Sequence, residues 1–222
     1  MDTKDWLLYY KQAETEGGPI TTQMCYAPLV SPDGSMFCMD FTYPTDYQAT
    51  QGRISYTEEF VNFMWEREVI CLQRIEKFSW APEVLGVDGK RIFIKWYGQT
   101  CNDLVYGTKD LEQKHPMWRQ QIRNIIIEQY NQNILKPTVY PHSHYFDDQG
   151  NMRAIDFYSC VSKTNPLLPY NLIESMIGSN SRFDAAREGD NINVETIFKS
   201  GLKDFSKWPG GLEFIYRELY PC

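Results

Sequence analysis

The sequence lacks the features of a membrane or secreted protein. No apolar run among the 222 residues approaches the roughly 20 residues that a bilayer-spanning helix needs. The first residues, Met1 to Trp6, do not have the charged-then-apolar layout of a signal peptide. We therefore expect a cytoplasmic protein that does not bind membranes.

Positive charge is also scarce. The chain has 22 Lys and Arg against 29 Asp and Glu, for a net charge of -7. A surplus of negative charge disfavours non-specific electrostatic binding to nucleic acid or to an anionic membrane surface. A protein partner is the expectation that remains.

The cysteines lack the spacing of a metal or redox motif. Six of them stand at 25, 38, 71, 101, 160 and 222, and no two form a CxxC pair. That spacing disfavours a zinc knuckle or a thioredoxin-type motif, and the absence of a secretion signal predicts buried, reduced thiols.

The composition is that of a globular protein and is rich in aromatic residues. It is 42% hydrophobic, 23% charged and 15% aromatic, with 15 Tyr and 6 Trp. A chain of this length can bury one large core or two smaller ones, and the rings predict a core of large amphipathic side chains.

The most informative stretch runs from Tyr140 to Tyr158. Two β-prone segments flank a turn with the sequence Asp-Asp-Gln-Gly-Asn, which predicts a hairpin because Gly and Asn accept a positive φ. The hairpin would place His142 and His144 at one end and Asp156 at the other. Antiparallel pairing would then bring these three side chains together.

The first half predicts the order β-β-α-β-β. Two β-prone runs, 24–30 and 35–41, flank a Pro-Asp-Gly turn, and two more, 83–87 and 91–97, flank Asp88-Gly89. Between them a helix is expected from Thr57, with an apolar stripe at helical spacing.

Glu68 falls on that apolar stripe. A buried carboxylate needs a cation or several hydrogen-bond donors, because desolvating it alone costs several kcal/mol. Lys95, which follows three apolar residues of a strand, is one candidate cation, although it could equally face solvent. Glu68 could instead lie at the edge of the stripe and reach water.

The second half is predicted to be mainly helical. A long amphipathic helix begins near Trp118 and stops near Asn133, a plausible C-terminal cap. After the hairpin we expect an extended loop over 161–170, then helices over 170–177, 194–205 and 212–219.

This order of elements resembles the protein-kinase fold, and is closer to compact kinase-like and aminoglycoside-phosphotransferase-like proteins. The resemblance covers roughly residues 24–220. It implies an α+β fold with two lobes in one domain spanning 1–222. The first lobe, about 20–98, would hold a small antiparallel sheet plus one helix, and the second, 99–222, would be mainly helical.

Individual sequence motifs also resemble those of the kinase family. Glu68 matches the helix Glu that pairs with a strand Lys in the family, and Trp96-Tyr97-Gly98 resembles the hinge between lobes. Ile155-Asp156-Phe157 resembles the Asp-Phe-Gly motif, whose Asp binds the magnesium on ATP phosphates. Tyr158 stands where the family has its glycine. The resemblance therefore implies Glu68, Lys95 and Asp156 as the residues for ATP, with Asp156 as the magnesium ligand.

Other family motifs are missing. The first hairpin carries no GxGxxG loop, and Met39 or Asp40 occupies the place of the phosphate-binding Lys. The catalytic Asp and Asn positions fall on Val139 and His144 in one register. They fall on Thr138 and Ser143 in the other. Because neither register supplies a base carboxylate or a metal-binding Asn, the resemblance implies a degenerate kinase, a pseudokinase.

Several readings of the histidine and aromatic residues stay open. His142, His144 and Asp156 could ligate a metal, or a His could act as a general base, or the imidazoles could simply stabilise the loop. Asp156 could merely accept backbone N–H bonds. The rings of Trp96, Tyr97, Tyr140, Tyr145 and Tyr158 could form a partner-binding patch or part of the core.

The sequence thus supports three hypotheses. The first is a catalytically impaired kinase-like protein that acts as a binding or regulatory module. The second is an atypical phosphotransferase that uses ATP and magnesium through Asp156. The third is a phage structural or host-takeover scaffold. It follows from a resemblance of the stretch around Tyr140 to kinase-like proteins of tailed phages of marine cyanobacteria, which implies a host or phage protein partner in the host cytoplasm and carries no activity with it.

Overall fold

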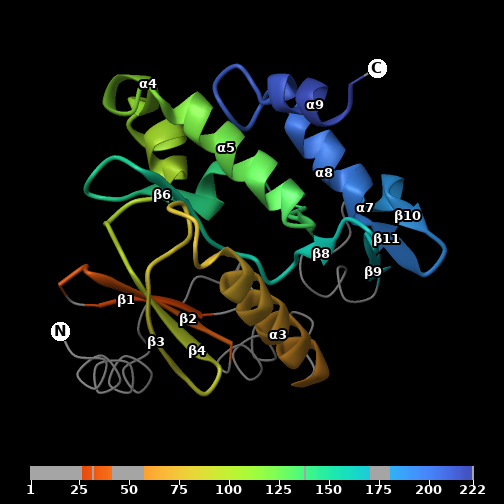
Figure 1. The fold of residues 1–222 in the computed structure, drawn as a ribbon, viewed down its shortest axis with the longest axis horizontal. Helices are drawn as coiled ribbons and strands as arrows, with labels where there is room; N and C mark the ends of the chain where they lie inside the picture. The colour runs from red at the N-terminus through yellow and green to blue at the C-terminus, as the bar shows by residue number, and fades with distance from the viewer. Residues whose placement is uncertain (1–26, 32, 42–57, 138, 171–180, 222) are drawn as a thin grey trace.

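The computed structural model describes residues 27–31, 33–41, 58–137, 139–170 and 181–221. The chain forms a mixed α/β structure of small antiparallel sheets and several helices (Figure 1). The strands are β1 (Ala27–Val30), β2 (Met36–Asp40), β3 (Val84–Asp88), β4 (Arg91–Lys95), β5 (Ile134–Leu135), β6 (His144–Phe146), β7 (Met152–Ala154), β8 (Val161–Ser162), β9 (Leu167–Pro169), β10 (Arg187–Glu188) and β11 (Asn191–Asn193). The helices are α3 (Glu58–Ile75), the π-helical η1 (Asp103–Gly107), α4 (Leu111–Lys114), α5 (Trp118–Asn131), the 3-10 turn η2 (Pro141–Ser143), α7 (Ser181–Ala185), α8 (Val194–Lys203) and α9 (Glu213–Leu219).

The N-terminal sheet confirms the expected β-β-α-β-β order. Its four strands lie in the order β1-β2-β4-β3, all antiparallel, and α3 lies beside the sheet (Figure 1). Gly34 and Gly89 have φ values of 72° and 56° in the two turns, a conformation that side chains with a Cβ rarely adopt. Residues 24–26 and the expected cap Thr57 lie outside the described residues.

Helix α3 joins two hydrophobic clusters. Its predicted stripe is buried, with Val61, Met64 and Ile75 at most 4% exposed. One cluster lies between the sheet and α3, and the other fills the C-terminal half. Phe63 and Leu72 of α3 pack against both clusters. The helix is therefore the element through which the two halves share a core.

The C-terminal half is built around α5. Its buried face carries Trp118, Ile122, Ile125 and Ile126, and the chain leaves the helix through Asn133, which has a φ of 62° as a left-handed C-terminal residue does. Helices α8 and α9 pack nearby (Figure 1). The expected helices over 118–133, 194–205 and 212–219 are confirmed with shifts of a few residues.

The expectation of an extended loop over 161–170 is wrong in part. Strand β8 pairs with β5, and β9 joins β10 and β11 in a three-stranded sheet. Strands of two or three residues are too short to give a periodic pattern, and tertiary pairing alone defines them. The expected helix over 170–177 lies almost wholly outside the described residues.

The aromatic residues near the hairpin are core in part. Trp96 is 9% exposed and Tyr145 is fully buried, and both belong to the cluster beneath the sheet. The rings of Phe37 and Trp96 stack at 5.1 Å, and Trp96 lies 5.1 Å from Tyr145. These two rings are therefore unavailable as a surface patch.

Two further expectations concern thiols and membranes. Cys38, Cys71, Cys101 and Cys160 are buried, as expected, and Cys71, Cys101 and Cys160 are free thiols. Within the described ranges, no helix combines the length and apolarity that crossing a bilayer requires.

Candidate functional site

The β6–β7 hairpin positions the predicted site. His144 pairs with Ala154, Tyr145 with Arg153 and Phe146 with Met152. Gly150 takes a φ of 77° in the turn. The register brings His144 to the end of the hairpin from which Asp156 emerges, so the predicted juxtaposition of these two stretches of chain is confirmed.

Asp147 holds the hairpin turn closed. Its carboxylate accepts hydrogen bonds from the backbone N–H groups of Gln149 at 3.0 Å and Asn151 at 2.8 Å. It also forms an ion pair with Arg153 at 3.0 Å. Because four or more donors converge on one buried carboxylate, the turn is rigid enough to fix where Asp156 leaves it.

Three buried charged side chains meet behind the hairpin. Glu68 of α3 is 0% exposed, Lys136 after β5 is 1% exposed and Asp156 after β7 is 5% exposed. The Lys136 Nζ donates a hydrogen bond to the carbonyl of Ile155 and lies 5.0 Å from the centroid of the Phe157 ring. Neither carboxyl oxygen of Glu68 has a hydrogen-bond partner among the described residues.

Burial and neighbouring charges shift the pKa values of Glu68 and Lys136. Burial raises the pKa of Glu68 well above its ordinary value, the negative charge of Asp156 raises it further, and Lys136 opposes both. Burial lowers the pKa of Lys136, while Asp156 is the strongest charge that opposes this and Glu68 a weaker one. Burial therefore favours the uncharged form of Glu68, and Asp156 is the charge that most favours the ammonium form of Lys136.

Asp156 adopts a left-handed backbone with a φ of 66°. Such a conformation costs an ordinary residue about 1 kcal/mol or more, and it persists only where the surroundings impose it. Here the N–H of Ile155 donates to the carbonyl of Ser143 at 2.9 Å, and Lys136 holds the Ile155 carbonyl. These bonds fix the peptide that precedes Asp156.

The two histidines are arranged differently from the expectation. His142 lies in the 3-10 turn η2 and only His144 lies in a strand, so they do not share one face of an extended strand. The Nδ1 of His144 lies 3.0 Å from the carbonyl oxygen of Tyr140, and burial lowers its pKa well below the ordinary value. His144 is therefore a neutral core residue that stabilises the loop.

His142 is half-buried, and burial lowers its pKa although Asp156 opposes that effect. In the part of the chain that the structure describes, no three His, Cys, Asp or Glu side chains form a cluster that could hold a metal ion. The reading of His142, His144 and Asp156 as a metal triad is therefore wrong. The roles of His142 and His144 as catalytic groups remain predictions.

Lys95 is not the cation for Glu68. It is 40% exposed and pairs with Glu83 at 3.6 Å on the outer part of the sheet. Lys136 faces Glu68 instead, and this residue was missed. The available signal was the requirement of a buried Glu68 for a cation, combined with a lysine that directly follows two apolar residues, Ile134 and Leu135.

The position in strand β2 where the kinase family has its phosphate-binding Lys holds no cation. Met39 is 1% exposed in the core, and the buried Asp40 pairs with Arg91 at 3.1 Å. Arg91 is thus bound rather than free to contact a ligand. The rings of Phe37, Trp96 and Tyr145 pack between the sheet and the hairpin.

ATP and magnesium do not fit this set of residues. The Lys136 amine is bonded to a backbone carbonyl, and Glu68 and Asp156 are buried beside it. Lys95, the lysine predicted for ATP, pairs with Glu83 instead. Magnesium keeps several water ligands and binds protein through one or two accessible carboxylates, which a fully buried cluster does not offer.

Comparisons with known proteins give distant structural likenesses. The chain matches no family model and no curated protein. A co-crystal structure of WbdD with the kinase inhibitor LY294002 is 16% identical with a TM-score of 0.42, and the match covers 83% of this chain and 46% of that one. A crystal structure of monomeric WbdD is also 16% identical, with a TM-score of 0.40 over 64% of this chain and 33% of that one. The chain thus spans less than half the length of these WbdD chains, and the likeness concerns the arrangement of the chain alone.

Proposed function

We propose that this protein is a catalytically impaired kinase-like module that works by binding rather than by phosphoryl transfer. The observation that carries the proposal is the buried cluster of Glu68, Lys136 and Asp156. Phosphoryl transfer depends on cations and metal ligands that face the phosphates. A lysine bonded to the Ile155 carbonyl and a fully buried Glu68 beside it are arranged as a core instead.

The rings beneath the sheet support the same proposal. Phe37 stacks on Trp96 on the sheet side, and Trp96 in turn contacts Tyr145 of the hairpin, so apolar side chains join the two elements. Such a junction stabilises the relative position of the elements by burying area, which favours a fixed scaffold over a site that opens for a nucleotide.

We further propose a single domain with two lobes, about 20–98 and 99–222. The division of the described core into one cluster under the sheet and one in the C-terminal half supports this organisation. The free, buried thiols support a reducing, cytoplasmic setting. A host or phage protein as the partner, and a scaffold role in a phage, rest only on the resemblance of the stretch around Tyr140.

Nucleotide binding tests the proposal directly. Thermal unfolding of the full chain is followed with ATP and magnesium, with ATP and EDTA, and without ligand, for the wild type and for Asp156→Asn. A ligand that binds only the native state at a hundredfold excess over its Kd stabilises it by about 2.7 kcal/mol. We expect no shift in any arm and no phosphate release.

The opposite result would identify the atypical phosphotransferase. A magnesium-dependent shift of the wild type that Asp156→Asn abolishes would assign the metal to Asp156 after all. Phosphate release or transfer in the same samples would overturn the pseudokinase proposal. A shift without turnover would retain a binding module but make a nucleotide its ligand.

A further inference from the structure

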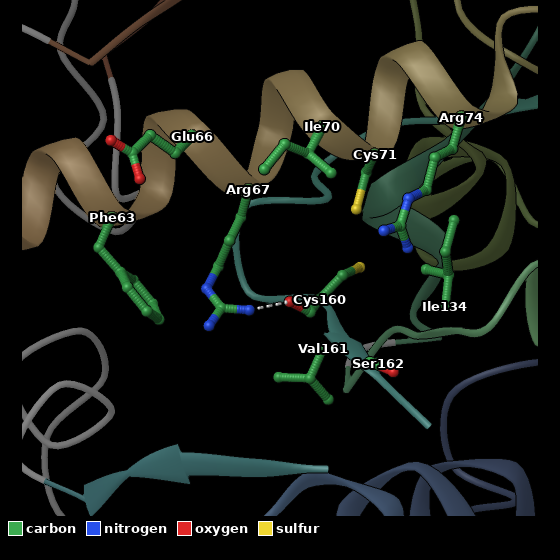
Figure 2. Close-up of a pocket in the computed structure, with 10 residues that line it drawn as sticks. All are labelled: Phe63, Glu66, Arg67, Ile70, Cys71, Arg74, Ile134, Cys160, Val161 and Ser162. Carbon is green, nitrogen blue, oxygen red and sulfur yellow. Dashed lines mark hydrogen bonds between the residues drawn. The ribbon is translucent and has the colours of Figure 1, made fainter. Parts of the chain in front are cut away.

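A cavity of about 310 Å³ lies between α3 and the chain that follows the hairpin. Figure 2 shows Cys71 and two arginines of α3 on one side and Cys160 and Val161 on the other. The cavity is separate from the cluster around Asp156, although both are bounded by α3. A water molecule occupies about 30 Å³ in the liquid, so the cavity has room for a small polar molecule.

Two thiols line this cavity and face one another. Cys71 is 7% exposed and Cys160 is 2% exposed, and both are free. Figure 2 shows their sulfur atoms directed toward each other, and the two side chains are in hydrogen-bonding contact. Thiols in direct contact are placed to exchange a proton and to react with one another.

The surroundings distinguish the two thiols. Contact with the Cys160 thiol lowers the pKa of Cys71, burial opposes this, and the positive charges of Arg74, Arg67 and Lys136 lower it further. Burial raises the pKa of Cys160 well above its ordinary value. Because the thiolate is the nucleophile, Cys71 is the thiol that reacts first and Cys160 the one that follows.

Arg67 lines the cavity with a positive charge, and its guanidinium is fixed by contacts with neighbouring groups. Its Nη1 donates to the carbonyl of Cys160 at 2.7 Å, and its guanidinium lies 3.9 Å from the centre of the Phe63 ring. Its buried Nε has no hydrogen-bond partner among the described residues. A fixed guanidinium stabilises the negative charge that develops on an attacking sulfur and on a departing hydroxide.

We propose that Cys71 and Cys160 form a peroxide-sensitive thiol pair that closes to a disulfide between α3 and the segment after Asp156. The Cys71 thiolate attacks hydrogen peroxide, so that an S–O bond forms, the O–O bond breaks and hydroxide leaves. The Cys160 thiol then attacks the sulfur of the sulfenic acid. An S–S bond forms, the S–O bond breaks and water leaves with the proton of Cys160. The two thiols are oxidised by two electrons and one peroxide is reduced.

The disulfide would act on the geometry of the buried cluster. Cys71 lies three residues after Glu68 on the same helix, and Cys160 lies four residues after Asp156. Linking the two cysteines therefore fixes the side of α3 that carries Glu68 against the chain that carries Asp156. This inference goes beyond the proposed function and does not depend on nucleotide binding.

Thiol mapping of the full chain tests the proposal. Reduced protein is desalted without oxygen, treated with hydrogen peroxide and then alkylated, digested without reductant and analysed by mass spectrometry. We expect a Cys71–Cys160 linked peptide. We also expect Cys71 to be consumed on the order of tenfold faster than Cys101, a buried thiol outside the cavity whose pKa burial raises.

Two variants separate the steps. In Cys160→Ser a sulfenic acid should accumulate at Cys71 and be captured by dimedone, and in Cys71→Ser position 160 should stay reduced. Cys101→Ser is the matched control, and its linked peptide should form at the wild-type rate. If either variant fails to fold, the wild-type mapping still decides. A Cys71 that reacts no faster than Cys101, or a disulfide that uses other cysteines, would overturn the proposal.

Discussion

At the scale of single residues, protonation decides what the buried cluster contributes to stability. Asp156 is the strongest charge acting on Lys136, while Glu68 has no hydrogen-bond partner among the described residues. A neutral carboxylic acid costs far less to bury than a carboxylate. We therefore expect the contribution of Glu68 to the free energy of unfolding to fall as pH rises. The contribution of a carboxylate in a surface ion pair rises with pH instead.

Glu68→Gln should remove one component of that pH dependence. The pKa of Glu68 is raised above its ordinary 4.5, so above pH 4.5 the native state binds a proton that the unfolded state has lost. The stabilisation is complete below pH 4.5, and it is lost as pH rises toward the folded pKa, by at most about 1.4 kcal/mol per pH unit. In urea unfolding from about pH 5 to about pH 8, the free energy of unfolding of the wild type relative to that of Glu68→Gln should show this decline as pH rises.

Glu66→Gln provides the control, because Glu66 lies on the exposed side of the same helix. It should leave the pH dependence unchanged. If Glu68→Gln instead loses several kcal/mol at every pH, Glu68 is ionised and forms an ion pair with Lys136, and the charge assignment is wrong.

His144 should give a slope of the opposite sign. Its pKa is lowered well below the ordinary 6.5, so below pH 6.5 the unfolded state binds a proton that the native state excludes. The contribution of His144 to the free energy of unfolding should therefore fall as pH falls below 6.5. His144→Asn keeps an amide N–H for the Tyr140 carbonyl and removes this slope, while lost contact with Trp208 costs about 1–3 kcal/mol throughout.

The same urea series measures this change. Between pH 4.5 and 6.5 the effects of Glu68 and His144 oppose each other, so the wild-type curve alone does not separate them and the two variants do. A His144→Asn curve parallel to the wild type would show that His144 binds its proton over the same pH range in the native and the unfolded state. The buried, neutral assignment would then fail.

The sequence was sufficient to place Glu68 on a buried face but not to find its neighbour. The helical period fixes which side of α3 is apolar, and that pattern is local. Lys136 follows β5 and bonds to Ile155 after β7, so its place beside Glu68 of α3 depends on contacts between distant segments. Lys95 was a candidate because it follows three apolar residues of a strand, a local signal that does not show which residue lies beside Glu68 in space.

At the scale of elements, the β6–β7 hairpin was the easiest feature to predict because a turn sequence and two β-prone runs define it locally. What the sequence did not predict are β8 to β11, whose two or three residues pair only through tertiary contacts. The 3-10 turn at His142 was likewise missed, because Pro141 suits the start of such a turn as well as an extended strand.

Asp147 should be the residue on which the hairpin depends most. Its side chain is 2% exposed and accepts from Gln149, Asn151 and Arg153, so truncation leaves several donors unpaired. We expect Asp147→Ala to lower the free energy of unfolding by about 2–4 kcal/mol in urea. The neighbouring Asp148 is exposed, and Asp148→Ala should change it by no more than about 0.5 kcal/mol.

Hydrogen exchange locates the effect. Amide protons of β6 and β7 should lose more protection in Asp147→Ala than those of α8, because the turn is the point at which the hairpin opens. Equal costs for Asp147→Ala and Asp148→Ala would show that the hydrogen bonds of the turn do not hold the hairpin.

At the scale of the whole molecule, α3 decides whether the two clusters unfold together. Phe63 and Leu72 are packed against both, and Glu68 on the same helix faces Lys136 from the C-terminal half. Because α3 packs against both clusters, unfolding of one cluster disturbs the helix on which the other cluster also packs. One cooperative transition is therefore expected, although the described residues form two distinct clusters.

Leu72→Ala tests that coupling. Removing a partly buried leucine that contacts both clusters should lower the free energy of unfolding by about 1–3 kcal/mol. Native-state hydrogen exchange should show the same loss of protection in β4 of the sheet and in α5 of the C-terminal half, because both exchange through one global opening. Val87→Ala is the control, since Val87 is 56% exposed and its truncation should change neither. A loss confined to β4 or to α5 would mean that the two halves open independently, and that α3 belongs to only one of them.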